Sequence, residues 1–277
     1  MRSLSPRIYT RNYYLKASGN PFEFLRFVSK NKARKIEYFD SIIKNYEKLK
    51  VLDIGCGTGA LDIYLAKKGA NVVAIDYSKD AISLAKTNLA KETMDVKKKI
   101  KFLNIDIKKT NFKNNFFDLV IAIDVFEHLY KEELEQIMKI ISKSLRKDGL
   151  LLVHTEANKI YLDFTHKYYV YPMASLLIWL NKVFTKKHYK NLSKNPRNKY
   201  HLEQHVNEPT LFYLKRLFER YRFEGEIKSL VSMIKPILSW KDIVYNLIVL
   251  LYPFCKIWPF YYLFAYDYLC LMKNRKR

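Results

Sequence analysis

Short apolar runs alternate with amphipathic segments through the middle of the chain. A short apolar run suits a strand buried on both faces of a parallel sheet, whereas apolar positions spaced three and four apart suit one helix face. Read in this way, the sequence predicts strands at 49–54, 71–76, 100–105, 117–123 and 149–155, and helices at 58–68, 79–91 and 131–146. Repeated strand–helix units of this kind build a parallel sheet with right-handed crossovers.

The segment 131–146 is the clearest amphipathic helix of this series. Its apolar side chains recur at helical spacing, at Leu134, Ile137, Met138, Ile141 and Leu145, and so form one face. Gly149 follows them, and we expect it to end the helix as a C-cap, because glycine readily adopts the left-handed conformation found there.

The regular alternation stops after Thr155. Residues 156–208 form a long insertion, in which an apolar run (168–181) precedes a stretch rich in lysine. Glu208-Pro209-Thr210 then begins an amphipathic helix, with Pro209 expected early in it. The remaining chain predicts a sixth strand at 221–230 and a last strand at 265–272.

Two apolar blocks, 168–181 and 243–255, stand out in this second half. Each is shorter than the 18 or so residues that a membrane-spanning helix needs. Trp179, Trp240 and Trp258 lie near basic residues, a pattern typical of interfacial segments whose rings reach lipid headgroups. Three interpretations stay open: peripheral membrane contact, a buried aromatic cap over a substrate pocket, and a partner interface.

The first 45 residues mix aromatic with basic side chains, and 31–46 predicts a helix. Residues 1–20 contain no apolar run behind a basic start, so we expect no signal peptide. The three cysteines include no Cys-x-x-Cys pair, which argues against a disulfide framework or a zinc site and favours a reducing, cytoplasmic setting.

The net charge of the chain indicates more about its binding partners than about its fold, and its size indicates that it can form a core. At 277 residues with 49% apolar content, the chain can fill a substantial core. Its 50 basic and 27 acidic residues give a formal charge of +23. Such an excess attracts RNA, anionic lipid surfaces or phosphorylated substrates, although the lysine-rich composition produced by an A/T-rich genome would give the same number.

The most specific feature is the segment 51–59, which reads Val-Leu-Asp-Ile-Gly-Cys-Gly-Thr-Gly. Its apolar start suits a buried strand, and Gly55, Gly57 and Gly59 suit a tight turn that lets backbone approach a ligand closely. A helix after the turn would leave free N–H groups facing that ligand. Cys56 lies inside the turn, where a small side chain fits.

Two ligand classes could use this turn. Gly55, Gly57 and Ala60 also fit a dinucleotide fingerprint, with Asp76 at the distance expected for an acid on a ribose hydroxyl. Asp53 argues against a diphosphate, because two like charges a few ångströms apart cost about 1 to 4 kcal/mol. A cationic nucleoside without phosphate, such as S-adenosylmethionine, is compatible with this carboxylate. The residues favour the second class.

The order of motifs around this turn resembles that of the class I S-adenosylmethionine-dependent methyltransferases, and in particular the ubiquinone-biosynthesis O-methyltransferases of the methyltransferase type 11 group. The segments that carry the resemblance are 51–59, 71–76, 100–107, 117–129 and 149–155. They cover residues 45–155 closely and the remainder loosely. The resemblance implies an α/β, Rossmann-like sheet of seven mostly parallel strands, with the last strand antiparallel and helical insertions after strands five and six.

The resemblance also implies a division of one methyltransferase domain spanning 1–277. Its parts would be an N-terminal lid over the cofactor (1–45), a cofactor-binding core (46–155), an insertion that caps the substrate (156–208) and a C-terminal completion of the sheet (209–277). A helix packed on the sheet edge is the alternative for the N-terminal part.

Residue roles follow from the same resemblance. The cofactor S-adenosylmethionine would lie on the glycine turn, with Asp53 near its amino group, Asp76 on the ribose and Asp106 on the adenine. Ile107 would pack on the adenine ring, and Asp124 would contact the methionine moiety or the acceptor. The cofactor-binding set is thus Asp53, Gly55, Cys56, Gly57, Gly59, Asp76, Tyr77, Asp106, Ile107 and Asp124.

His128 and His154 are the candidate catalytic residues. A hydroxyl acceptor must lose a proton, so a base near the transferred methyl group helps, and both histidines follow or end predicted strands. Asp124, Glu127 and His128 match an acid-x-x-Glu-His arrangement that could bind a divalent ion. We assign no metal, since the spacing identifies no fourth ligand, although His154 or His205 could serve.

The sequence therefore predicts methyl transfer from S-adenosylmethionine to a small-molecule or lipid-like acceptor, with oxygen methylation at an anionic membrane surface as its specific form. Two alternatives remain. RNA methylation is suggested by the charge, but no Asn-Pro-Pro-Tyr-like tetrapeptide follows the fourth predicted strand. A non-catalytic S-adenosylmethionine-binding protein is the other, and an NAD-linked oxidoreductase is disfavoured by Asp53.

Overall fold

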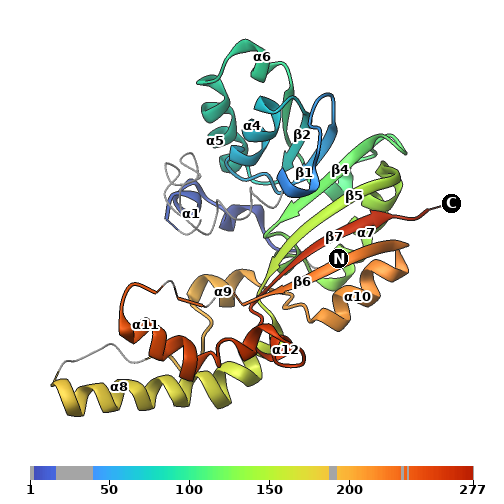
Figure 1. Cartoon of the computed structure of the whole chain (residues 1–277). Helices are drawn as coiled ribbons and strands as arrows, with labels where there is room; N and C mark the ends of the chain where they lie inside the picture. The colour runs from blue at the N-terminus through green and yellow to red at the C-terminus, as the bar shows by residue number, and fades with distance from the viewer. Residues whose placement is uncertain (1–2, 17–39, 187–191, 232–233, 236, 277) are drawn as a thin grey trace.

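A seven-stranded sheet organises the computed structural model, which describes residues 3–16, 40–186, 192–231, 234–235 and 237–276 (Figure 1). The strands are β1 (Lys50–Ile54), β2 (Asn71–Asp76), β3 (Ile100–Asn104), β4 (Phe117–Ile123), β5 (Leu145–Glu156), β6 (Phe223–Leu230) and β7 (Asp267–Asn274). Their order across the sheet is β3-β2-β1-β4-β5-β7-β6. Only β7 runs antiparallel to its neighbours, so the Rossmann-like fold predicted from the sequence is confirmed.

Helices cover both faces of the sheet. The described helices are α1 (Arg11–Lys16), α4 (Ala60–Lys67), α5 (Lys79–Ala90), α6 (Met94–Lys97), α7 (Lys131–Ser144), α8 (Tyr171–Thr185), α9 (Lys199–Gln204), α10 (Leu211–Arg220), α11 (Trp240–Val244) and α12 (Phe260–Phe264). Two π-helices, η4 (Tyr161–Val170) and η5 (Tyr245–Val249), and the short turns η1 (Pro6–Ile8), η2 (Ile107–Lys109), η3 (Phe126–His128) and η6 (Phe254–Lys256) complete the set.

The apolar runs form strands because both faces of the sheet are buried. In β4, Val120 and Ala122 belong to a core shared with α7 and α10, whereas Leu119 and Ile121 belong to a core shared with α4 and α5. Successive side chains of a strand point to opposite faces, so a strand between two helical layers is apolar along most of its length. The continuous apolar pattern therefore locates the central strands.

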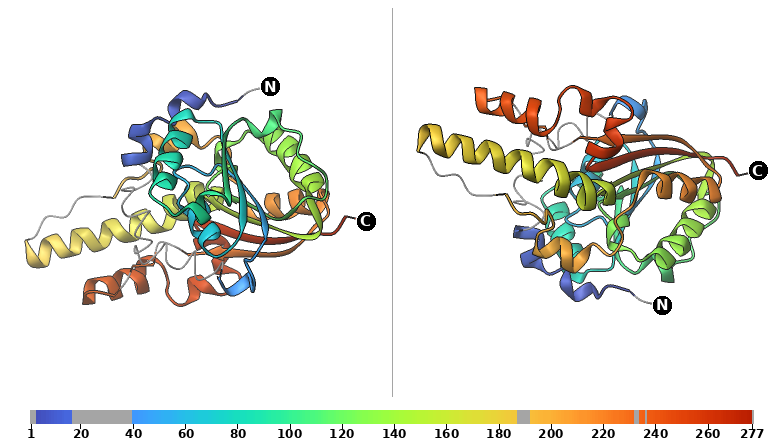
Figure 2. Two further views of the ribbon diagram at one scale, coloured as in Figure 1. Left: turned by 90° about the horizontal axis from the view of Figure 1, so that it is seen from above. Right: turned by 90° about the horizontal axis from the view of Figure 1, so that it is seen from below.

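The insertions after β5 and β6 pack on each other. Buried side chains from both, including Tyr161, Val170, Val249 and Phe264, form a core of their own. We call the described residues of 157–185 and 234–264 the helical extension. Figure 2 shows that α8 and the α11 segment project from the sheet on the same side. The extension begins at the carboxyl ends of β5 and β6, the sheet edge at which ligands bind in such folds.

Three expectations about helix and strand ends are wrong. Helix α7 ends at Ser144, and Gly149 lies within β5 rather than at the helix C-cap. Pairing of Leu145 with Phe117 begins the strand there, which overrides the local glycine signal. Pro209 precedes helix α10, whose N-cap is Thr210. His154 lies inside β5, which continues to Glu156.

The predicted helix at 31–46 falls mostly outside the described residues. Within the described part, 40–42 are helical and 43–49 are not.

Candidate functional site

The glycine turn joins β1 to α4 and approaches the segment after β4. Gly55 has φ +75°, and a methyl group on its Cα would lie 2.6 Å from Cγ2 of Val125. A larger residue would therefore push the turn away from the β4 side. The main-chain N–H groups of Gly55 and Cys56 both donate to the carbonyl of Ile75, at 2.8 and 3.1 Å. These contacts hold the turn against the end of β2.

Asp76, at the carboxyl end of β2, contacts the same turn through its side chain. Its Oδ2 accepts from the N–H of Gly57 at 3.0 Å, and its Oδ1 accepts from the N–H of Ser78 at 2.8 Å. Burial raises the pKa of Asp76 to about 6, in spite of these two donors, which favour the charged form. The carboxyl group expected to hold a ribose is thus placed against the glycine turn.

Tyrosines of the N-terminal segment close one side of this region. Tyr14 of α1 is buried, and its Cε1 lies 3.6 Å from the position a methyl group would take on Gly57. The carbonyl of Tyr9 accepts from the hydroxyl of Ser78 at 2.7 Å. The Tyr9 ring also contacts the rings of Tyr77 and His128, with centroids 5.5 Å apart in each pair. The N-terminal segment therefore bridges the ends of β2 and β4.

The segment after β4 adds an acid–histidine pair. Asp124 has φ +56°, and its Oδ1 pairs with Nδ1 of His154 on the adjacent strand. Nε2 of His154 lies 3.7 Å from Oδ2 of Asp267 on β7. Asp124 is exposed whereas the His154 side chain is only 3% exposed. Thus His154 lies behind Asp124 and can orient that carboxylate.

Glu127, His128 and His205 form a second cluster beside this pair. Each offers one ligand atom, and these atoms all lie within 4.8 Å of one another. Glu127 is completely buried, and its Oε2 accepts from the hydroxyl of Thr155 at 2.9 Å. Burial, and then the negative charge of Asp124, raise the pKa of Glu127 well above its usual value.

The main-chain carbonyl of Gln204 decides which nitrogen of His128 carries the proton. Nδ1 of His128 lies 3.1 Å from this oxygen. A carbonyl oxygen only accepts, so Nδ1 donates and Nε2 carries the lone pair in the neutral ring. Burial lowers the pKa of His128, which keeps the ring neutral near pH 7. His128 therefore presents a basic nitrogen or a metal ligand.

Helix α9 and the residues after it bring His205 to His128. Their ring centroids are 5.0 Å apart, and those of His205 and His201 are 3.9 Å apart. The N–H groups of Val206 and Asn207 both donate to the carbonyl of Glu127, at 2.9 and 3.1 Å. Burial lowers the pKa of His205 to about 3, with the neighbouring His128 adding to the effect.

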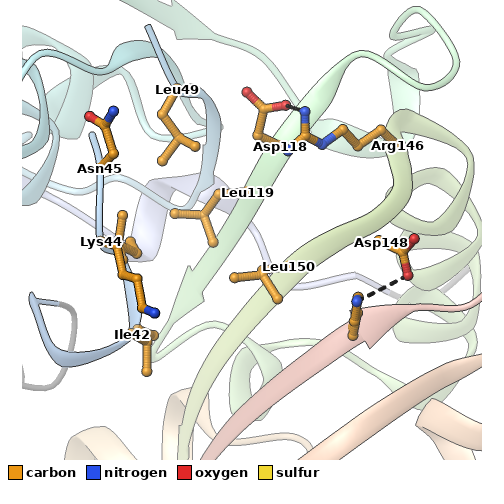
Figure 3. Close-up of a pocket in the computed structure, with 11 residues that line it drawn as sticks. Ile42, Lys44, Asn45, Leu49, Asp118, Leu119, Arg146, Asp148 and Leu150 are labelled. Atoms are coloured by element: carbon orange, nitrogen blue, oxygen red, sulfur yellow. Dashed lines mark ion pairs between the residues drawn. The ribbon is translucent and has the colours of Figure 1, made fainter. Parts of the chain in front are cut away.

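A pocket of about 350 Å³ lies elsewhere, at the amino ends of β1 and β4. Figure 3 shows its lining residues, among which Arg146 pairs with Asp118, and Lys273 pairs with Asp148. Two of its three basic side chains are thus paired with acids, and the pocket lies away from the glycine turn. We do not assign it to the site.

Known proteins resemble this chain in sequence and in fold. Residues 52–153 match the model of a methyltransferase domain family. The ubiquinone biosynthesis O-methyltransferase of Pelagibacter ubique is 32% identical over 166 residues, which cover 58% of this chain and 62% of that protein. The Rickettsia typhi protein of the same name is 31% identical, covering 46% and 52%. The chain thus spans between about half and three fifths of these relatives.

Solved structures show the same fold. The S-adenosylmethionine-dependent methyltransferase of Mesorhizobium loti aligns with a TM-score of 0.55 at 14% identity, over 86% of this chain and 96% of that one. The phosphoethanolamine N-methyltransferase 2 of Haemonchus contortus aligns with a TM-score of 0.63 at 14% identity, over 99% and 61%. Residues 52–153 thus resemble a methyltransferase domain in sequence, and the described chain has the fold of S-adenosylmethionine-dependent methyltransferases.

The remaining predicted cofactor residues occupy varied positions in the structure. Asp53 is buried in β1, and Cys56 is buried in the turn. Asp106 accepts from the N–H of Lys108 at 2.9 Å and lies 3.5 Å from its Nζ. Ile107 is buried in the core shared with α7. Their cofactor roles remain predictions, as do those of the glycines, Asp76, Tyr77 and Asp124.

Two residues beside the candidate site, His201 and Asp62, were not predicted from the sequence. His205 was named from the sequence only as a possible metal ligand. The docking of α9 places its ring beside His128 and the ring of His201 beside that of His205. Asp62 follows the glycine turn and is completely buried. The sequence offered one indication of this burial, because Asp62 lies among apolar residues on the inner face of the helix.

Proposed function

We propose that this protein moves a methyl group from S-adenosylmethionine to a hydroxyl group of a small, lipid-like acceptor at a membrane surface. The observation that carries the proposal is the contact between two halves of the site. Gly55 of the cofactor turn touches Val125, three residues before His128. The segment that carries His128, the candidate base, therefore packs against the turn that would hold the methyl donor.

The residues near the glycine turn fit the cofactor. Bound S-adenosylmethionine supplies an electrophilic methyl group on a sulfonium. Asp76 would hold the ribose, Asp106 the adenine amino group, and Asp53 would face the cationic amino-acid end. All three are acids, and Asp53 and Asp76 form no ion pair with a lysine or arginine among the described residues. A ligand with positive charge and no phosphate suits such a site.

His128 would take the acceptor proton through Nε2. Its Nδ1 donates to the Gln204 carbonyl, and this bond would stabilise the imidazolium formed when Nε2 is protonated. Exclusion of water by Tyr9 and the residues after α9 would favour transfer to the acceptor rather than to solvent. Asp124, oriented by His154, would contact the acceptor or the methionine moiety.

The surface of the helical extension supports a lipid-like acceptor. Large apolar side chains project from it, with exposed fractions from 58% at Trp179 to 82% at Leu238; the others include Phe184, Ile237, Trp240 and Trp258. Exposed apolar patches mark interaction sites. Lys241 lies over the Trp240 ring, with Nζ 6.0 Å from its centroid, and Lys256 lies 4.7 Å from that of Tyr252. Aromatic and basic side chains together are typical of protein surfaces that bind anionic lipid.

None of the described helices combines the length and apolar character needed to cross a bilayer. Contact through the helical extension would therefore be interfacial, with rings at headgroup depth.

The test is methylation of a cell extract with methyl-labelled S-adenosylmethionine, followed by separation of lipid, RNA and polar fractions. We expect the label in the lipid fraction. The labelled methyl group should be attached as a methyl ether, which is stable to mild base. Label confined to RNA would reject a lipid-like acceptor. The His128→Gln variant is the control, because label that depends on the enzyme should be much weaker with it.

A further inference from the structure

Two neighbouring polar side chains are buried in the helical extension without all of their hydrogen bonds. They are Tyr161 and His166, both of which belong to η4. Tyr161 is completely buried, and His166 is 4% exposed. Within the part of the chain that the structure describes, neither the hydroxyl of Tyr161 nor Nδ1 of His166 has a hydrogen-bond partner. A buried polar atom without a partner costs free energy, so two of them in one place require an explanation.

The π-helical form of η4 brings the two side chains together. A π-helix forms its hydrogen bonds between residues five apart, so such residues lie on successive turns. Tyr161 and His166 have this spacing, and their ring centroids are 6.1 Å apart. In an α-helix, Thr165 would be the neighbour of Tyr161 instead. The pair therefore depends on a helix form that is rare and occurs frequently at functional sites.

Other hydroxyl groups of η4 have partners. The hydroxyl of Thr165 donates to the carbonyl of Leu263 at 2.7 Å, and that of Tyr169 donates to the carbonyl of Ile248 at 2.6 Å. The same helix thus satisfies the hydroxyls on either side of His166, and the unpartnered hydroxyl of Tyr161 is an exception among them.

The second nitrogen of His166 determines which kind of group the pair can bind. Nε2 lies 2.9 Å from the carbonyl oxygen of Ser193. A carbonyl oxygen only accepts, so Nε2 donates and Nδ1 is an acceptor in the neutral ring. The hydroxyl of Tyr161 can donate. The two residues therefore offer one donor and one acceptor, which a single hydroxyl group can satisfy by accepting from Tyr161 and donating to His166.

The surroundings of the pair favour an uncharged, apolar molecule. Tyr161 belongs to the apolar core of the helical extension, together with Val170, where a charged group would be costly to bury. On the same helix, Phe164 and Tyr168 are exposed, with ring centroids 5.5 Å apart. Exposed apolar side chains of this kind are where an apolar molecule can first bind.

We propose that Tyr161 and His166 form a binding site for the hydroxyl group of an uncharged, apolar alcohol. The hydroxyl accepts from Oη of Tyr161 and donates to Nδ1 of His166, and no covalent bond changes. This inference does not depend on the proposed function, because no step of methyl transfer enters it.

Calorimetric titration of the full chain with 1-hexanol at pH 8 tests the site. We expect saturable binding at one site. Methyl pentyl ether has the same atoms but no hydroxyl proton, so it cannot donate to His166 and should bind at least about fivefold more weakly. Tyr161→Phe removes only the hydroxyl oxygen, and it should weaken the binding of 1-hexanol by a similar factor.

Tyr169→Phe is the matched control, because the Tyr169 hydroxyl already has a partner in the same core. This variant should bind 1-hexanol as tightly as the wild type does. Absence of saturable binding to the wild type, equal affinity of the wild type for the alcohol and the ether, or an unchanged affinity in Tyr161→Phe would each reject the site.

Thermal unfolding without alcohol distinguishes this site from a position filled by a buried water molecule. If the two atoms have no partner in the free protein, Tyr161→Phe should raise the melting temperature, because it removes a buried polar atom and breaks no bond. Tyr169→Phe should lower it, since the Ile248 carbonyl loses its donor. A lower melting temperature for Tyr161→Phe, together with no binding of 1-hexanol to the wild type, would assign the position to water and overturn the proposal.

Discussion

At the residue scale, one main-chain carbonyl defines the chemistry of His128. The Gln204 oxygen takes the Nδ1 proton, and burial lowers the pKa of the ring. A histidine held in this way is neutral at pH 7 with Nε2 available as a base. Its ring also belongs to the Glu127–His128–His205 cluster. An experiment must therefore distinguish a base from a metal ligand as the role of His128.

We expect His128→Gln to lower kcat by about 10²- to 10⁴-fold. Glutamine can still donate to the Gln204 carbonyl but cannot take a proton, so the affinity for S-adenosylmethionine should stay within about twofold of the wild type. Because burial lowers the pKa of His128, the acidic limb of the wild-type kcat profile should lie below pH 6.5 and be absent from the variant. Steady-state kinetics across pH measures both.

A chelator separates the two roles of His128. We expect the rate after treatment with EDTA to equal the untreated rate. Loss of activity that added divalent metal restores would contradict the base assignment and identify the cluster as a metal site.

At the element scale, α9 depends on an ion-pair network at the edge of the helical extension. Arg197 donates to both oxygens of Glu208, at 2.5 and 2.6 Å, and to Asp163 of η4 at 2.6 Å. Glu208 also lies 3.3 Å from Nε2 of His201. Burial opposes ionisation of Glu208, but its bonds to Arg197 and His201 lower its pKa to about 2. This network holds the segment that carries His205.

We expect Arg197→Ala to lower the free energy of unfolding by about 1–2 kcal/mol, because charged hydrogen bonds at a partly exposed site are lost. Because folding lowers the pKa of Glu208, its ionised carboxylate stabilises the folded state at pH values above the pKa of the unfolded chain. This stabilisation disappears as the carboxylate is protonated, so the wild type should lose it between about pH 4 and 2. Denaturant unfolding at several pH values measures the effect. The variant should show little of that loss.

Arg220→Ala provides the comparison. Arg220 pairs with Glu135, and 63% of its side chain is exposed, so we expect a cost below about 0.5 kcal/mol. Equal effects of the two substitutions would contradict a special role for the Arg197 network.

The elements also show what could be predicted from the sequence. Central strands and the glycine turn depend on local patterns, since apolar runs are buried on both faces and glycines are needed at positive φ. The end of α7 was missed because pairing of Leu145 with Phe117 decides it. His205 was named only as a possible metal ligand, and its place beside His128 was not predicted, because the residues after α9 dock on Glu127, a contact that no local pattern encodes.

At the scale of the whole molecule, the helical extension and the net charge of +23 are the two features on which the proposed membrane contact depends. The extension exposes aromatic rings on the sheet edge that holds the site, and lysines flank them. Such a surface would bind anionic lipid by insertion of rings and by electrostatic attraction, which salt weakens. Its position would present a lipid acceptor to His128.

We expect the protein to co-sediment with vesicles that contain phosphatidylglycerol, and the double variant Trp240→Ser, Trp258→Ser to bind about tenfold more weakly. Met94→Ser is the matched control, because Met94 is 63% exposed on α6, outside the extension. Equal binding of the double variant and the wild type would contradict membrane contact through these rings.

The central claim is that the turn at 55–59 holds a cationic nucleoside and excludes a dinucleotide. Equilibrium dialysis with labelled S-adenosylmethionine, in competition with unlabelled S-adenosylhomocysteine or NAD, tests it most directly. We expect saturable binding at one site, displacement by S-adenosylhomocysteine, and no displacement by NAD. Displacement by NAD, or no saturable binding to the folded protein, would contradict the account.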